Sequence, residues 1–211
     1  GGAGGIQDHW GAGIPHLVAL RGAPPGQIGG AYTPREDGYS NATELTAGIR
    51  AIAPFEVSVG LYPHIHPESP SIEHDIDVLK AKVDAGATRA ITQFFFDIDG
   101  YLRFMERVRK AGVTIPISTG IMPVTNFKGL KKMAGPIGIE VPPWLANLFD
   151  GLDKDHETRR LISASVATEM CAPLAAGGVA EFRFYPRSRG RLVHSVCRDA
   201  GGAGPDDKAP T

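Results

Sequence analysis

Polar and aromatic side chains follow the strand-like run Val-Ser-Val-Gly-Leu at residues 57–61. Tyr62 comes directly after this run, and His64, His66 and Glu68 lie within the next six residues. An aromatic ring in this place can stack on a planar ligand, and an imidazole can donate to a phosphate or hydroxyl oxygen. Two histidines beside a carboxylate could instead ligate a metal that activates water. The segment therefore indicates either a cofactor site or a metal site.

A second polar group lies in the stretch at residues 89–97. Ile91, Phe94 and Phe96 are expected to be buried, whereas Thr92 and Gln93 come at the end of the strand. In α/β barrels and open α/β sheets, the carboxyl ends of the strands carry the ligand-binding groups. The amide of Gln93 both donates and accepts hydrogen bonds, so we expect it to bind an amide or the edge of a heterocycle.

Strands and helices alternate along the chain, which predicts a parallel α/β fold. In the helix expected at residues 71–85, Ile72, Ile76, Leu79 and Val83 recur at spacings of three and four, so one face should pack on the sheet. The expected strands are residues 16–20, 55–61, 89–94, 115–118 and 181–185, and the expected helices are residues 41–53, 71–85, 98–111, 126–134 and 157–175.

Five β/α units are fewer than the eight of a closed barrel, which usually takes about 250 residues. We expect one domain at residues 1–198. The Gly-rich residues 1–5 are expected to be flexible. Residues 199–211 are rich in Gly, Pro, Ala and Asp and lack periodicity, so we expect a disordered tail.

Three segments, residues 62–68, 89–97 and 120–127, together resemble the catalytic barrel of methylenetetrahydrofolate reductase. They read Tyr-Pro-His-Ile-His-Pro-Glu, Arg-Ala-Ile-Thr-Gln-Phe-Phe-Phe-Asp and Gly-Ile-Met-Pro-Val-Thr-Asn-Phe. The resemblance implies a (β/α)8 TIM-barrel type of α/β fold that is incomplete. It covers the last five strands of the family's barrel, roughly residues 10–199, and not its first three. It implies a flavoprotein of one-carbon and methionine metabolism that uses FAD to pass hydride from NADH or NADPH to 5,10-methylenetetrahydrofolate.

The resemblance also assigns binding residues. Gln93 and Arg189 match positions that bind folate, and Gln93 also meets the nicotinamide. Phe127 falls in a segment that borders the same pocket, or packs in the core. The positions that match FAD contacts are Arg21, Gly22, Ala42, Tyr62, His66, Ser69, Asp75 and Lys82.

The chain departs from the family's pattern at the catalytic acid. The first strand of the family carries a glutamate that protonates the folate nitrogen, so that the five-membered ring opens. No matching glutamate is found in this sequence, and no catalytic residue is assigned. Ala23 stands where the family has an aspartate beside the flavin, and Pro186 and Ser188 change the loop before Arg189. Val78 and Ala81 replace polar FAD contacts.

Two alternatives to a working reductase follow. The chain could be an impaired or non-catalytic paralogue, or a fragment, that binds flavin or folate. It could also be a metal-dependent barrel hydrolase that uses His64 and His66, but Thr92, Ser118 and Tyr185 occupy the strand ends where further ligands would be needed. We therefore assign no metal ligand.

Composition sets limits on the partners. A net charge of −1 gives no electrostatic reason to expect nucleic acid or an anionic membrane. No apolar run approaches the about 18 residues that a membrane-spanning helix needs. Cys171 and Cys197 lie in apolar surroundings without Cys-x-x-Cys spacing, which indicates buried thiols in a reducing compartment. We expect a cytoplasmic protein that binds folate and nicotinamide, and a homo-oligomer, because an incomplete sheet exposes its edges.

Overall fold

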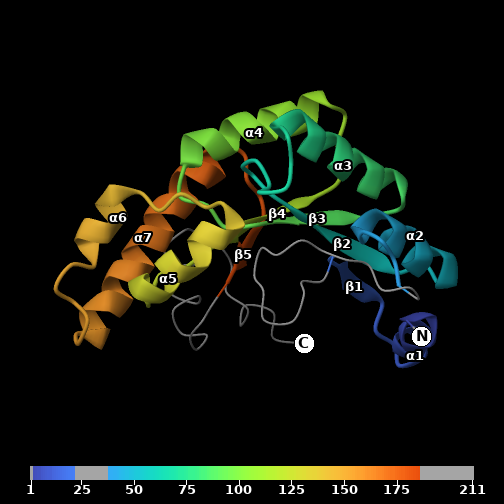
Figure 1. Ribbon diagram of the computed structural model, residues 1–211, viewed down its shortest axis with the longest axis horizontal. Helices are drawn as coiled ribbons and strands as arrows, with labels where there is room; N and C mark the ends of the chain where they lie inside the picture. Colours follow the sequence, from blue (N-terminus) through green and yellow to red (C-terminus); the bar gives the residue numbers. More distant parts are fainter. Residues whose placement is uncertain (1, 22–37, 186–211) are drawn as a thin grey trace, which may run out of the picture. The chain divides into compact units, whose positions relative to one another are not determined.

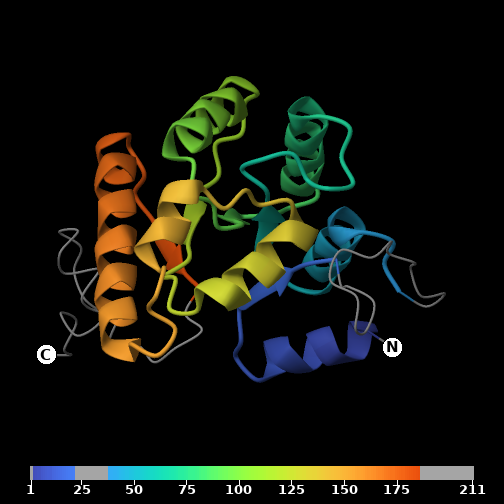
Figure 2. The same cartoon turned by 60° about the vertical axis from the view of Figure 1, so that its left-hand side comes forward.

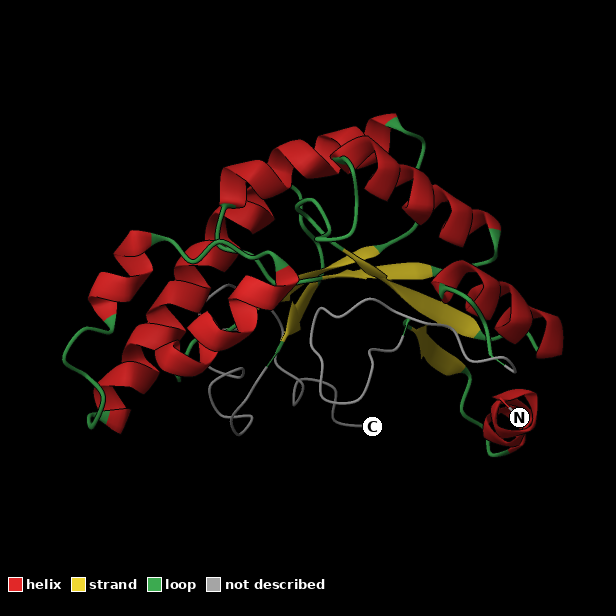
Figure 3. Ribbon diagram, viewed as in Figure 1, coloured by secondary structure: helices red, strands yellow, loops and turns green. Residues whose placement is uncertain are grey.

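The computed structural model of this 211-residue chain describes residues 2–21 and 38–185. Helices and strands alternate along most of it, as Figures 1 and 3 show. The helices are α1 (Gly2–Gly11), α2 (Ala42–Ile52), α3 (Ile72–Asp84), α4 (Ile98–Lys110), α5 (Phe127–Ala134), α6 (Pro143–Leu148) and α7 (His156–Ala176), with a short 3-10 helix at Gly135–Ile137. The strands are β1 (His16–Ala19), β2 (Glu56–Leu61), β3 (Arg89–Thr92), β4 (Ile117–Ile121) and β5 (Phe182–Phe184).

The chain divides into two compact units. The first unit consists of Gly1–Gln93 and Arg103–Ser118, and the second unit consists of Phe94–Leu102 and Thr119–Thr211. Helix α4 and strand β4 each begin in one unit and end in the other. The single domain predicted for residues 1–198 stays a prediction, and the predicted tail at residues 199–211 lies outside the described residues.

The five strands are parallel and pair in chain order, from β1 to β5. In a doubly wound sheet the strand order reverses partway, whereas in a (β/α)8 barrel each strand lies beside the one before it. Five parallel strands paired in this order, with helices between them, confirm the predicted α/β fold of the barrel type. Because the strands are parallel, their carboxyl ends meet at one edge of the sheet.

The ends of the helices follow local signals in the sequence. The side chains of Asn41, Ser71 and Asn126 each accept a hydrogen bond from a backbone N–H in the first turn of the helix that follows. Such caps satisfy donors that the helix itself leaves unpaired. Gly86 follows α3 with a φ of 103°, a conformation that glycine adopts without strain. The predicted helices and strands are therefore found with small shifts at their ends.

The core of the first unit lies between the strands and helices α2 and α3, which run beside β2 in Figure 1. Val57 and Val59 alternate along β2 and are fully buried, and Ile76 and Leu79 of α3 pack in the same cluster. The predicted apolar stripe of α3 is confirmed. Its polar positions are then held at fixed places relative to the end of β2.

The expectation of a flexible Gly-rich start is wrong for residues 2–5, which belong to helix α1. Glycine costs a helix about 1 kcal/mol per residue relative to alanine. Tertiary packing offsets that cost, because Ile6 packs against the core cluster and the Trp10 ring meets the Phe55 ring edge-on, with centroids 5.0 Å apart. Local propensity alone did not indicate these contacts.

Helices α5, α6 and α7 of the second unit lie together, as Figures 1 and 2 both show. Buried residues of this unit include Leu130, Leu145, Leu174 and Cys171, which confirms the prediction for that cysteine; Cys197 lies outside the described residues. Tyr101 is 1% exposed, and its ring stacks on Phe95 with centroids 4.3 Å apart. Its hydroxyl lies 2.6 Å from Oγ1 of buried Thr119.

Tyr101→Phe is expected to lower the free energy of unfolding by about 1 to 3 kcal/mol, because the buried Thr119 hydroxyl loses its partner. Urea denaturation would measure the change. As a control, Tyr101→Phe combined with Thr119→Val should recover part of the loss, since the Thr119 hydroxyl is then removed together with its partner. A single variant as stable as the parent would show that the hydrogen bond does not contribute.

Within residues 2–21 and 38–185, no helix combines the length and the apolar character that crossing a bilayer requires.

Candidate functional site

Three polar side chains follow the carboxyl ends of neighbouring strands in the first unit. Arg21 lies two residues after β1, Tyr62 directly after β2 and Gln93 directly after β3. The backbone N–H of Gln93 donates to the carbonyl of Leu61 over 2.8 Å, which fixes the position of Gln93 beside the end of β2. Gln93 and Tyr62 are half-buried, and Thr92 is fully buried. The predicted placement of Thr92 and Gln93 at a strand's end is confirmed.

The loop after β2 is folded around His66. The backbone N–H of His66 donates to Oδ2 of Asp75 over 2.9 Å, and its carbonyl accepts from the N–H of Ser69 over 2.8 Å. The Tyr62 ring meets the imidazole of His66 edge-on, with centroids 4.4 Å apart. The ring of His64 lies 5.4 Å from that of Tyr62 by the same measure. Asp75, on α3, therefore shapes this loop, a contact that its position in the sequence did not indicate.

Lys82 reaches the same edge from α3. Its ammonium donates to the carbonyl of Gly60 over 2.9 Å, next to the end of β2. Burial lowers the pKa of Lys82, while the charge of Asp75 raises it and that of Arg21 lowers it. Asp75 and Lys82 thus face the loop after β2 and do not belong to a solvated helix face. The contact of these two residues with FAD stays a prediction.

Arg21 is held by an ion pair that spans 47 residues of the chain. Its guanidinium donates to Oε2 of Glu68. This hydrogen bond holds the pKa of Glu68 below its usual range. The backbone N–H of Glu68 donates to Nδ1 of His66 over 3.1 Å. Glu68 thus joins Arg21 to His66, and the sequence had suggested it only as a metal ligand.

Burial also sets the charge state of His66. Burial lowers the pKa of this imidazole, and the nearby charges act in opposite directions: Glu68 and Asp75 raise it, while Arg21 and Lys82 lower it. The net effect is a pKa below the usual value. His66 is therefore mainly neutral at pH 7 and suits hydrogen bonding more than charge neutralisation.

The other predicted contact residues either make local hydrogen bonds or lie outside the described residues. Ser69 donates its hydroxyl to the carbonyl of Ser71 over 3.1 Å, so the structure gives it a role within the loop. Ala42 is the buried first residue of α2, and its carbonyl accepts from the hydroxyl of Thr46. Gly22, Ala23, Pro186, Ser188 and Arg189 lie outside the described residues.

The metal interpretation gains no support from the geometry. Among the residues that the structure describes, no three His, Cys, Asp or Glu side chains are grouped as the ligands of a metal would be. Nδ1 of His66 already accepts a backbone N–H, and the carboxylate of Glu68 pairs with Arg21. Both groups are engaged in holding the loop.

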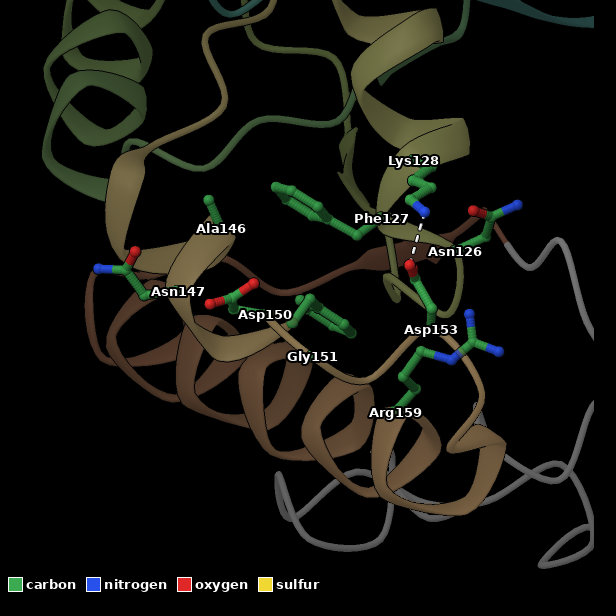
Figure 4. Close-up of a pocket in the computed structure, with 10 residues that line it drawn as sticks. Asn126, Phe127, Lys128, Ala146, Asn147, Asp150, Gly151, Asp153 and Arg159 are labelled. Atoms are coloured by element: carbon green, nitrogen blue, oxygen red, sulfur yellow. Dashed lines mark hydrogen bonds and ion pairs between the residues drawn. The ribbon is translucent and has the colours of Figure 1, made fainter.

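The second unit contains a separate cavity of about 550 Å³, shown in Figure 4. Phe127 lines it and stacks on Phe149, with ring centroids 5.6 Å apart and the planes nearly parallel. Lys128 and Asp153 form an ion pair of 2.6 Å across one side. Phe127 is half-buried, so it both packs in this unit and borders an open space. A role in folate binding stays a prediction.

Comparisons with known proteins agree on one family. The family model described as methylenetetrahydrofolate reductase matches residues 3–201. The chain is 44% identical over 196 residues to the 5,10-methylenetetrahydrofolate reductase of Escherichia coli (strain K12), covering 92% of this chain and 64% of that protein. It is 45% identical over 195 residues to the enzyme of the same name from Pectobacterium carotovorum subsp. carotovorum, with 92% and 63% covered. The chain thus spans just under two thirds of the length of these relatives.

A plant relative and a solved structure extend the comparison. The chain is 35% identical over 201 residues to methylenetetrahydrofolate reductase (NADH) 1 of Zea mays, covering 90% of this chain and 34% of that protein. An uncharacterized protein from Clostridium thermocellum, described as binding two copies of 5-methyl-5,6,7,8-tetrahydrofolic acid, superposes with a TM-score of 0.52 at 14% identity, covering 88% of this chain and 70% of that one. At this identity the likeness concerns the fold. From the family match and the bacterial identities together, this chain belongs to the methylenetetrahydrofolate reductase family.

Proposed function

We propose that this chain binds FAD at the carboxyl ends of β1, β2 and β3, and that it passes hydride from NADH or NADPH to 5,10-methylenetetrahydrofolate. Membership of the reductase family supports the reaction. The observation that carries the proposal is the placement of two cations, Arg21 and Lys82, near the imidazole of His66, which packs on the ring of Tyr62. These are the groups that a flavin dinucleotide needs: positive charge for the diphosphate, and a ring and hydrogen-bond donors for the rest.

The residues present fit such a ligand. Lys82 has three N–H donors, and among the described residues one is accepted, by the carbonyl of Gly60. The charge of Arg21 lowers the pKa of Lys82, so the two cations repel each other. An anion placed near both would relieve that repulsion and use the remaining donors. A diphosphate meets both requirements.

Each residue then has a definite task. Lys82 and Arg21 neutralise the diphosphate, and Tyr62 offers its half-buried ring to a planar group. FAD, when bound, would supply the redox chemistry, accepting two electrons from the nicotinamide and passing them to the folate. Gln93 orients the nicotinamide and the pterin in turn, since its amide can donate to one and accept from the other.

His66→Ala is expected to weaken FAD binding by about 1 to 3 kcal/mol, because one partly buried hydrogen bond is lost. Titration of FAD, followed by its fluorescence, would measure the dissociation constant, and the visible absorption spectrum of the purified protein would show whether FAD is carried at all. His74→Ala is the matched control, because His74 is an exposed histidine on α3. Equal dissociation constants for His66→Ala and the parent would contradict the assignment.

A second candidate is a protein that binds flavin or folate without completing the reaction. It is favoured by the carboxylates of the site, since Glu68 pairs with Arg21 and Asp75 accepts from the backbone of His66. Ala23, which stands where the family has an aspartate, also favours this second candidate. The two candidates share the FAD site and differ in the folate step.

A further inference from the structure

Glu68 makes two contacts with different parts of the same site. Its carboxylate accepts from the guanidinium of Arg21, and its backbone N–H donates to Nδ1 of His66. Arg21 follows β1, whereas His66 and Glu68 belong to the loop after β2. The ion pair therefore fixes the loop against the end of the neighbouring strand, and the backbone of Glu68 is fixed with it.

The contact between Glu68 and His66 determines which ring nitrogen carries the proton. A backbone amide cannot give up its hydrogen, so Nδ1 of His66 must present a lone pair to it. A neutral imidazole with a lone pair on Nδ1 carries its proton on Nε2. If Nδ1 were protonated, its N–H would face the backbone N–H of Glu68, and neither group could accept a hydrogen bond. The geometry thus favours one tautomer and disfavours the charged ring.

We infer that Glu68 is a positioning residue, which holds His66 as a neutral ring with its proton on Nε2 and so makes His66 a hydrogen-bond donor toward the ligand. The inference rests on the proposed function only for the identity of that ligand. It assigns Glu68 a role in the site that it exerts through His66. It also assigns different parts of the ligand to different donors. The cations bind the diphosphate, and His66 donates to an uncharged oxygen of the flavin's ribityl chain or ring.

The charged groups around His66 agree with this state. Glu68 lies in its own loop, Arg21 at the end of β1, and Asp75 and Lys82 on α3; the Tyr62 ring packs against it from the end of β2. The carboxylates raise the pKa of His66 and the cations lower it, while burial, the largest effect, lowers it. The imidazole therefore stays mainly neutral at pH 7.

The tautomer can be measured without any cofactor. In protein labelled with 15N-histidine, the two ring nitrogens give separate signals for the protonated and unprotonated sites. The chain has seven histidines, so a His66→Asn variant would assign the signals of His66. We expect the parent to show a single tautomer protonated on Nε2. Glu68→Gln should keep that tautomer, because its amide oxygen can still accept from Arg21.

Glu68→Ala should give a mixture of the two tautomers, because the loop is no longer tied to Arg21. Arg21→Met breaks the same ion pair from its other end and should produce the same mixture, which guards against a loss of folding in one variant. We also expect FAD binding to weaken about tenfold in Glu68→Ala, as for one lost neutral hydrogen bond, and much less in Glu68→Gln.

Three results would overturn the inference: a parent tautomer protonated on Nδ1, a charged ring at pH 7, or a single unchanged tautomer in both Glu68→Ala and Arg21→Met. Failure of the proposed function would look different. If the parent protein binds no FAD, the cofactor assignment is wrong, while the tautomer measured in the cofactor-free protein still decides the role of Glu68.

Discussion

Reoxidation of bound FAD by 5,10-methylenetetrahydrofolate is expected to be slower than its reduction by NADH or NADPH, because the loss of a general acid typically slows the step that needs it by about 100- to 10,000-fold. Opening the five-membered ring of the folate requires a proton on its nitrogen, whereas hydride transfer from the nicotinamide does not. The described part of the site offers no suitable acid. Arg21 lowers the pKa of Glu68, so this carboxyl is ionised at neutral pH, and Asp75 accepts from the backbone of His66.

Stopped-flow absorbance would separate the two half-reactions. The flavin bleaches when NADH or NADPH reduces it and recovers its colour when methylenetetrahydrofolate is added. Comparable rates of bleaching and recovery would show that an efficient acid is present and would count against the non-catalytic candidate. FAD that binds but does not bleach would leave binding as the function.

Lys82→Met is expected to weaken FAD binding about 10- to 100-fold, because one charge-assisted hydrogen bond to the diphosphate is lost. Binding of riboflavin, which lacks phosphate, should not change. His66→Ala should instead weaken both ligands by a similar factor. Lys80→Met is the control, because Lys80 is exposed on the same helix. Equal losses of FAD and riboflavin binding in Lys82→Met would place Lys82 away from the diphosphate.

The same substitution should leave the stability unchanged or raise it, because methionine replaces a partly buried charge with an apolar side chain. Burial lowers the pKa of Lys82, so the unfolded chain binds the lysine proton more tightly than the folded one. The parent should therefore gain stability as the pH rises from the lowered folded-state pKa toward that of an exposed lysine. Urea midpoints across the alkaline range should rise in the parent and rise less in Lys82→Met.

Local patterns were sufficient to predict most of the fold. The apolar stripe of α3 lies within one helix, and the cap residue Ser71 directly precedes that helix, so both can be recognised from the sequence alone. Helix α1 could not be found this way. Its glycines oppose a helix, and the contacts that stabilise it, such as Trp10 on Phe55, join residues 45 positions apart in the chain.

In the candidate site, too, some residues could be placed from the sequence and others could not. Tyr62 and Gln93 could be placed because each directly follows a strand, and parallel strands bring their carboxyl ends together. The ion pair between Arg21 and Glu68 could not be predicted, because charged residues are common in loops and no local pattern identifies which of them pair. The contact of Asp75 with the His66 backbone depends on how the loop returns to α3, which the residue types alone do not specify.

The sequential pairing of the strands also bears on how the chain folds. Each strand meets the strand made just before it, so the sheet can grow in the order of synthesis without waiting for a distant segment. The last addition spans the most chain: Thr119 pairs with Phe182, a separation more than twice that between Ala90 and Ile117. Closing the longer loop costs less than about 1 kcal/mol of extra entropy. The large separation of β4 and β5 along the chain should therefore slow their pairing only slightly.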